Sequence, residues 1–107
     1  MTQSERLVVF ITAGSAEEAD RLAEALVQER LAACVNIVPG LTSVYRWEGA
    51  LQRDQEWLLI AKTRRERFAA LVERVQTLHS YQVPEVIALP LVVGHAPYLA
   101  WLDEELA

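Results

Sequence analysis

The sequence holds a single cysteine, four glycines and four prolines among 107 residues, and it has no long apolar run. One cysteine excludes an internal disulfide and favours a reduced, cytoplasmic location. The longest apolar stretch is about eight residues, whereas a membrane-spanning helix needs roughly 20, so we expect no membrane partner. Residues 1–6 have neither a basic segment nor an apolar signal core, so we expect no secretion signal.

Positive charge is also scarce. Fifteen acidic residues outnumber ten basic residues, and the net charge of -5 repels phosphate backbones, so nucleic acid is not an expected partner. The length suits one domain, residues 1–107. The composition is 52% hydrophobic with a mean hydropathy of +0.12, which is high for a single small core. We therefore expect a homo-oligomer that buries the apolar surplus between subunits.

The common metal and phosphate motifs are missing as well. There is no CxxC, no HExxH and no glycine-rich phosphate loop. Two histidines and one cysteine cannot supply a complete soft-ligand sphere from one chain. Any tight metal site must therefore recruit several subunits, or use oxygen ligands and water.

The hydrophobic pattern predicts alternating strands and helices in the first half of the chain. Residues 7–11 form a branched apolar run typical of a central strand. Ser15 and Glu18 have the spacing of a capping box, and apolar residues then recur at helical spacing to about Leu31. Residues 33–47 read as one long strand, bent or bulged at Pro39-Gly40.

The second half repeats this order. Glu48-Gly49 is a plausible hairpin turn, followed by a return strand over residues 56–61. Thr63 and Glu66 repeat the capping-box spacing before a second amphipathic helix that ends near Leu78. Residues 86–93 read as a fourth strand, at an edge or bulged because of Pro90, and residues 96–106 as a terminal helix. The fold class is therefore α+β: a ferredoxin-like βαββαβ sandwich with a C-terminal helix, its antiparallel sheet covered by helices on one face.

The most informative segment is His79-Ser80-Tyr81-Gln82-Val83-Pro84-Glu85, at the exit of the second helix. It carries an imidazole, a phenol and a carboxylate, where an ordinary connection carries glycine, asparagine and serine. His79 suits a ligand or a proton acceptor, or it caps helix carbonyls and stabilises the helix dipole. Clustering with Tyr81 and Glu85 strengthens the interpretation as a site.

Topology separates the other candidates. The first helix returns the chain to one end of the sheet, where Cys34 and Lys62 should lie, whereas His79, Tyr45 and Trp47 should lie at the other end. A Cys34–His79 nucleophile–base pair within one chain is therefore not expected. Cys34 is either a soft metal ligand or a small buried apolar residue.

Four further side chains are candidates for either a binding role or a structural one. Lys62 either receives an anion or is an exposed charge. Tyr45 and Trp47 share one strand face, where packing in the core or at an interface is the simpler role. Glu56 is expected to pair with Arg46 across the hairpin.

Taken together, these segments resemble the CutA divalent-cation-tolerance proteins over most of residues 7–102. The resemblance rests on Ala33-Cys34-Val35-Asn36, Ser43-Val44-Tyr45-Arg46-Trp47, Glu56, Lys62-Thr63, residues 79–85, and Tyr98-Leu99-Ala100-Trp101. The family usually reads His-Pro-Tyr-Glu-Val-Pro-Glu where this chain has Ser80 and Gln82. The missing carboxylate weakens a hard-cation site at this point.

The resemblance implies a tight homotrimer, clefts between subunits, and a fold similar to the PII signalling proteins. It implies Cys34 and His79 as metal ligands. It also implies polar cleft positions at Tyr45, Trp47, Lys62, His79, Tyr81 and Glu85.

The leading hypothesis is a cytoplasmic trimer for tolerance of divalent cations, which binds copper(II) or another divalent cation weakly and has no obligatory cofactor. The alternative is a PII-like module whose cleft holds a small anionic ligand beside Lys62. An enzyme with His79 and Glu85 as acid–base groups is disfavoured, because no nucleophile or electrophile is identifiable nearby. A fourth interpretation is a stable trimeric scaffold without a ligand.

Overall fold

The computed structural model describes residues 5–107. The expectation about residues 1–6 therefore lies largely outside the described residues. The chain runs β1 (Arg6–Ala13), α1 (Ala16–Gln28), β2 (Cys34–Trp47), β3 (Ala50–Arg64), a 3-10 turn (Arg65–Arg67), α2 (Phe68–Leu78), β4 (Val86–Pro90) and α3 (Ala96–Glu105). None of the helices in this described part is long and apolar enough to cross a membrane.

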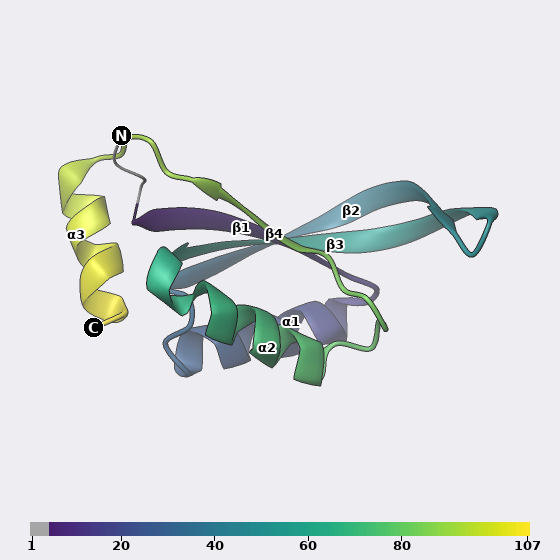
Figure 1. The fold of residues 1–107 in the computed structure, drawn as a ribbon, viewed down its shortest axis with the longest axis horizontal. Helices are drawn as coiled ribbons and strands as arrows, with labels where there is room; N and C mark the ends of the chain where they lie inside the picture. The colour runs from purple at the N-terminus through teal and green to yellow at the C-terminus, as the bar shows by residue number, and fades with distance from the viewer. Residues whose placement is uncertain (1–4) are drawn as a thin grey trace.

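The four strands form one antiparallel sheet in the order β2-β3-β1-β4. Figure 1 shows α1 and α2 on the same side of this sheet, and α3 packed across one end of it. This is the predicted ferredoxin-like α+β sandwich with an added terminal helix. The β2–β3 hairpin continues beyond the helices as an arm (Figure 1).

The core lies between the sheet and the two helices. In β1, buried residues alternate with partly exposed ones, so Val9 and Ile11 point toward the helices. Leu22 and Leu26 of α1 and Leu71 of α2 meet them and are fully buried. One sheet face is thereby covered, which explains the helical period in α1 and the alternation in β1.

Two sequence predictions of helix ends were wrong. α1 ends at Gln28 rather than Leu31, because Arg30 adopts φ 58° and the Leu31 amide donates back to the Leu26 carbonyl. This is a Schellman ending with an arginine at the position where glycine is usual, so no residue in the sequence marks the end of the helix. Thr63 does not cap α2, because its hydroxyl donates to the Leu31 carbonyl at 2.6 Å and a 3-10 turn precedes the helix.

The strands also differ from prediction in length and register. β3 extends over Ala50–Arg64, and β4 ends at Pro90 rather than Val93, although Pro90 does mark an edge strand. The two-residue turn at Glu48-Gly49 sets the β2–β3 register as far as Leu41, which lies opposite Glu56, and a bulge between Val38 and Leu41 shifts the register beyond that point. Arg46 instead faces Leu51, and the predicted Arg46–Glu56 pair is wrong.

Candidate functional site

A cleft of about 640 Å³ opens where the β2–β3 arm leaves the helices. Its walls come from the end of β1, from both strands of the arm and from the segment between α2 and β4: Thr12, Ser43, Val44, Tyr45, Trp47, Glu56, Tyr81, Gln82, Val83 and Glu85. Four of the six cleft positions implied by the resemblance therefore line one cavity, namely Tyr45, Trp47, Tyr81 and Glu85. Local alternation places Tyr45 and Trp47 on the same face of β2, as predicted.

The carboxylate of Glu56 is the innermost charge of this cleft. Its residue is 7% exposed, and the Tyr81 hydroxyl donates to it at 2.6 Å. Burial and this hydrogen bond raise the pKa of Tyr81, so the phenol stays protonated and remains the donor. The sequence prediction missed Glu56 as a cleft residue because it paired Glu56 with Arg46, whereas the turn at Glu48-Gly49 places Leu51 opposite Arg46.

Tyr45 forms a second phenol–carboxylate pair nearer the solvent. Its hydroxyl donates to Asp54 at 2.6 Å, and this hydrogen bond raises the pKa of Tyr45. The residues Tyr45 and Trp47 are both 42% exposed, whereas Tyr81 is half-buried. Each of the two tyrosines at the cleft is thus hydrogen-bonded to a carboxylate: Tyr81 to the buried Glu56, and Tyr45 to Asp54 nearer the solvent.

His79 lies behind the cleft rather than in its lining, and its side chain is buried. The ring Nε2–H donates to the Thr12 carbonyl at 2.7 Å, and Nδ1 accepts the Tyr81 amide at 3.1 Å. Both nitrogens are therefore occupied, so His79 could bind a metal only by giving up one of these bonds. The residue ends α2 and ties it to β1: its ring binds a strand carbonyl rather than the helix carbonyls that the capping interpretation expected.

Glu18 supports His79 from the first turn of α1. It accepts the Ser80 amide at 2.8 Å and the Gly14 amide at 3.4 Å, and it lies 3.7 Å from His79 Nδ1. Burial opposes its charge, but the hydrogen bonds from Ser80, the proximity of His79 and the Gly14 amide together lower the pKa of Glu18. The capping box is thus only half formed: Ser15 accepts the Glu18 amide at 3.1 Å, while the Glu18 carboxylate binds the loop after α2.

Cys34 and Lys62 lie together at the other end of the sheet. They are cross-strand partners, and Lys62 Nζ is 3.8 Å from the Cys34 sulfur and hydrogen-bonds to Asn36. The structure thus keeps Cys34 apart from His79, as the topology predicted, and Lys62 does not line the cleft of its own chain. Among residues 5–107 there is no group of three histidine, cysteine or acidic side chains placed to hold a metal ion.

A family model described as CutA1 divalent ion tolerance protein matches residues 7–105. The chain is similar to the divalent-cation tolerance protein CutA of Thermus thermophilus, with 59% identity over 91% of this chain and 94% of that protein. It is 54% identical to a chloroplastic CutA protein of Arabidopsis thaliana over 90% of this chain, and it spans about half of that protein's length (53%).

Solved structures agree with this sequence match. A Thermus thermophilus structure described as divalent cation tolerance protein (Cut A1) superposes with a TM-score of 0.93 at 56% identity, covering 95% of this chain and 99% of that one. A structure from Archaeoglobus fulgidus, described as a periplasmic divalent cation tolerance protein, gives a TM-score of 0.92 at 41% identity, covering 95% and 99% of the two chains.

Proposed function

Since the chain belongs to the CutA1 divalent ion tolerance protein family, we propose that it helps its cell tolerate divalent cations by binding them between the subunits of a homotrimer. Copper(II) is the proposed ion, and the protein acts as a binding protein rather than an enzyme. The observation that carries the proposal is the position of Cys34, a partly exposed thiol on an edge strand at the uncovered sheet face.

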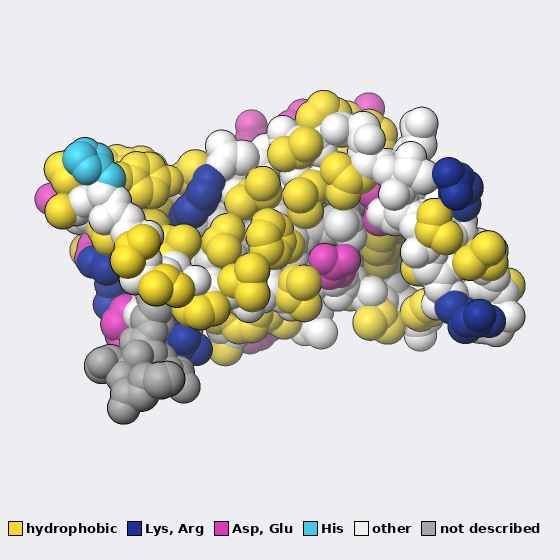
Figure 2. Space-filling view, turned by 90° about the horizontal axis from the view of Figure 1, so that it is seen from above, with side chains coloured by type: hydrophobic (Ala, Val, Ile, Leu, Met, Phe, Trp, Pro, Cys, Tyr) yellow, Lys and Arg dark blue, Asp and Glu magenta, His cyan; other side chains and the backbone are white. Residues whose placement is uncertain are grey.

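An apolar sheet face supports self-association. The face opposite α1 and α2 carries Val8, Phe10, Ile60, Ile87 and Leu89, which the strand register places next to one another. Ile87 and Leu89 are more than half exposed, and Figure 2 shows hydrophobic side chains spread over this side of the molecule. A surface of this kind is typical of a subunit interface.

The assembly is tested by light scattering at micromolar protein. We expect a mass three times the 12.1 kDa of one chain. A 12.1 kDa monomer would contradict both the trimer and any ion site that needs a second subunit.

The net charge of the protein and the chemistry of its thiol support copper(II) as the bound ion. The net charge of -5 favours cations near the surface, and a thiolate is a ligand that copper prefers. Because Lys62 is 3.8 Å from the sulfur, its ammonium opposes a second cation, which is consistent with weak binding. The remaining donors must come from a neighbouring subunit or from water, since one chain does not supply a set of three.

Calorimetric titration with copper(II) tests the ligands implied by the family, Cys34 and His79. We expect Cys34→Ser to weaken binding by about tenfold or more, while magnesium(II), which prefers oxygen ligands, serves as the control ion. His79→Ala should lower stability more than copper affinity, because both ring nitrogens already hold the fold together. Unchanged copper binding in the double variant would exclude both residues as ligands.

The alternative, a PII-like module for an anionic ligand, is less well supported. The cleft lining contains two carboxylates and no lysine, arginine or histidine of residues 5–107. A thermal-shift response to an anionic metabolite that Lys62→Ala abolishes would reverse this preference. The proposed cytoplasmic location is checked by cell fractionation, since the names of relatives include chloroplastic and periplasmic proteins.

A further inference from the structure

The cleft at the base of the β2–β3 arm has an uncompensated negative charge. Glu56 is more than nine-tenths buried, yet within residues 5–107 its carboxylate receives one hydrogen bond, from the Tyr81 phenol, and no ion pair. Burying a carboxylate without a positive partner is costly. A cation that enters the cleft would remove this cost, and Glu85 adds a second negative charge to the lining.

Three aromatic rings surround the same space: Tyr45, Trp47 and Tyr81. The negative face of an aromatic ring attracts a cation, and indole does so best. Both phenols donate to carboxylates at 2.6 Å, which leaves electron density on the rings and turns their hydroxyl protons away from a bound cation. The rings and the carboxylates together therefore favour a ligand that carries a positive charge and also has apolar groups.

The size and chemistry of the cleft argue against a bare metal ion at this place. A divalent ion requires several oxygen, nitrogen or sulfur ligands in one tight shell. The described residues supply no cluster of three such side chains, and a volume of about 640 Å³ is in the range of small-molecule sites.

We propose that this cleft binds a small organic ammonium ion, with its cationic group between the rings of Tyr45, Trp47 and Tyr81 and against Glu56. The site is separate from Cys34 at the opposite end of the sheet and does not depend on the proposed binding of divalent cations. Trp47 provides the main aromatic wall, Glu56 provides the inner charge, and Glu85 provides a weaker charge near the solvent.

The test is a protein-observed NMR titration of the full chain in its native assembly with tetramethylammonium chloride. The matched neutral probe is tert-butanol, which has a similar branched apolar body without the charge, and sodium chloride controls for ionic strength. We expect saturable shifts centred on the Trp47 indole N–H with tetramethylammonium, and binding of tert-butanol weaker by about tenfold or more. Equal affinity for the two probes, or no saturable binding of tetramethylammonium, would overturn the proposal.

Three glutamate-to-glutamine variants measure how much each negative charge contributes to tetramethylammonium binding. Glu56→Gln keeps an acceptor for Tyr81 and should weaken tetramethylammonium binding by about tenfold, whereas Glu85→Gln should weaken it about two- to threefold, because solvent screens an exposed charge. Glu104→Gln, at an exposed position of α3, should leave tetramethylammonium binding unchanged.

If Glu56→Gln does not fold, Trp47→Leu on the exposed arm replaces it, with an expected several-fold loss of tetramethylammonium affinity. Full affinity in a folded Glu56→Gln or Trp47→Leu variant would refute the assignment, as would displacement of tetramethylammonium by magnesium chloride at matched ionic strength.

Discussion

The phenol of Tyr81 donates a 2.6 Å hydrogen bond to the buried carboxylate of Glu56, joining the segment after α2 to the middle of β3. Tyr81 also stacks on His79, with ring centroids 4.5 Å apart, and its amide donates to the same imidazole. One residue thus connects the cleft wall to the polar contacts behind it.

Removing this phenol should destabilise the protein more than removing an exposed one. Tyr81→Phe leaves Glu56 without its donor, so we expect a loss of about 1–3 kcal/mol in the free energy of unfolding. Tyr45→Phe removes a hydrogen bond of the same length at an exposed position and should cost less. Chemical denaturation at one fixed protomer concentration measures both, because assembly contributes to apparent stability. Equal losses would show that burial of Glu56 is not the cause.

Glu18 should make stability depend on pH in the acidic range. Its pKa in the folded protein is lowered from the ordinary 4.5, so folding favours the ionised form. The sign follows: the stabilisation is complete above pH 4.5 and is lost as the pH falls through the lowered value, where Glu18 becomes protonated. The difference in unfolding free energy between the natural protein and Glu18→Gln should therefore shrink on acidification.

Glu17 offers the matched control for that experiment, since it also lies in the first turn of α1 but is exposed. Glu17→Gln removes the same charge from the same helix turn without the contacts of Glu18 to Ser80 and Gly14, so the two pH profiles are compared directly. A Glu18→Gln difference that stays constant from neutral to acidic pH would contradict the role assigned to the carboxylate.

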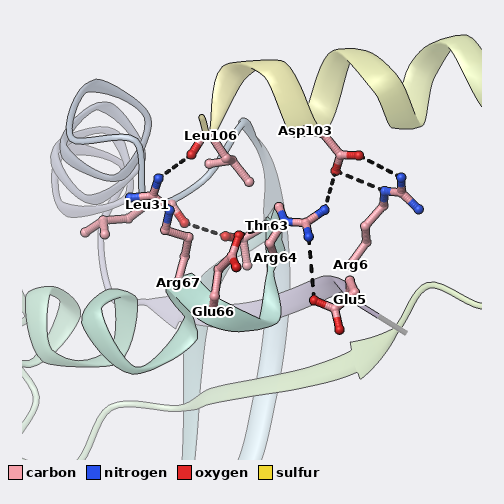
Figure 3. Close-up of polar contacts among 9 residues, drawn as sticks. All are labelled: Glu5, Arg6, Leu31, Thr63, Arg64, Glu66, Arg67, Asp103 and Leu106. Carbon is pink, nitrogen blue, oxygen red and sulfur yellow. Dashed lines mark hydrogen bonds and ion pairs between the residues drawn. The ribbon is translucent and has the colours of Figure 1, made fainter. Parts of the chain in front are cut away.

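Helix α3 is held to the body by the buried side chains of Leu102 and Leu106 and by charged contacts, which Figure 3 shows around Asp103. Arg6 donates to Asp103 at 2.7 and 3.1 Å and Arg64 at 2.7 Å, and these hydrogen bonds, Arg6 first, hold the pKa of Asp103 below its usual range. Asp103→Asn should speed hydrogen exchange of the α3 amides while core amides of β1 keep their protection. Glu104→Gln is the neighbouring control and should leave α3 exchange unchanged.

The β2–β3 turn contains a residue in an unfavourable conformation. Glu48 and Gly49 have φ values of 50° and 80°, as a type I′ hairpin turn requires, and glutamate is a poor residue for the first of these positions. Glu48→Asn should stabilise the protein by about 0.5 kcal/mol, whereas Glu48→Gln should not. Thermal unfolding of the two variants compares a change in backbone preference with a change in charge alone. Equal melting temperatures would contradict the explanation.

The order of helices and strands and the position of the hairpin turn could be predicted from the sequence, because both depend on residues that are near one another in the chain. The branched apolar run of β1 and the helical period of α1 help to predict the element order, and that order gives the sheet topology and the separation of Cys34 from His79. The Glu48-Gly49 turn was also predicted correctly, because positive φ angles favour glycine strongly.

The parts that were missed depend on contacts between distant residues. Thr63 resembles a helix cap in sequence, but its partner is the carbonyl of Leu31, which only the folded chain brings near. The expected Arg46–Glu56 pair was instead an error of register, because the two-residue turn at Glu48-Gly49 places Leu51 opposite Arg46 and Leu41 opposite Glu56. The pairing of Glu18 with Ser80 likewise joins the start of α1 to the end of α2, and no spacing in the sequence encodes it.

The contacts of α3 also imply an order of folding. Arg30 donates to the Glu105 carbonyl and Arg67 to the Leu106 carbonyl, while Arg6 and Arg64 hold Asp103. These four arginines belong to β1, the end of α1, the end of β3 and the 3-10 turn, so their positions exist only after the sandwich has formed. Helix α3 should therefore dock last during folding and detach first as a separate unit during unfolding.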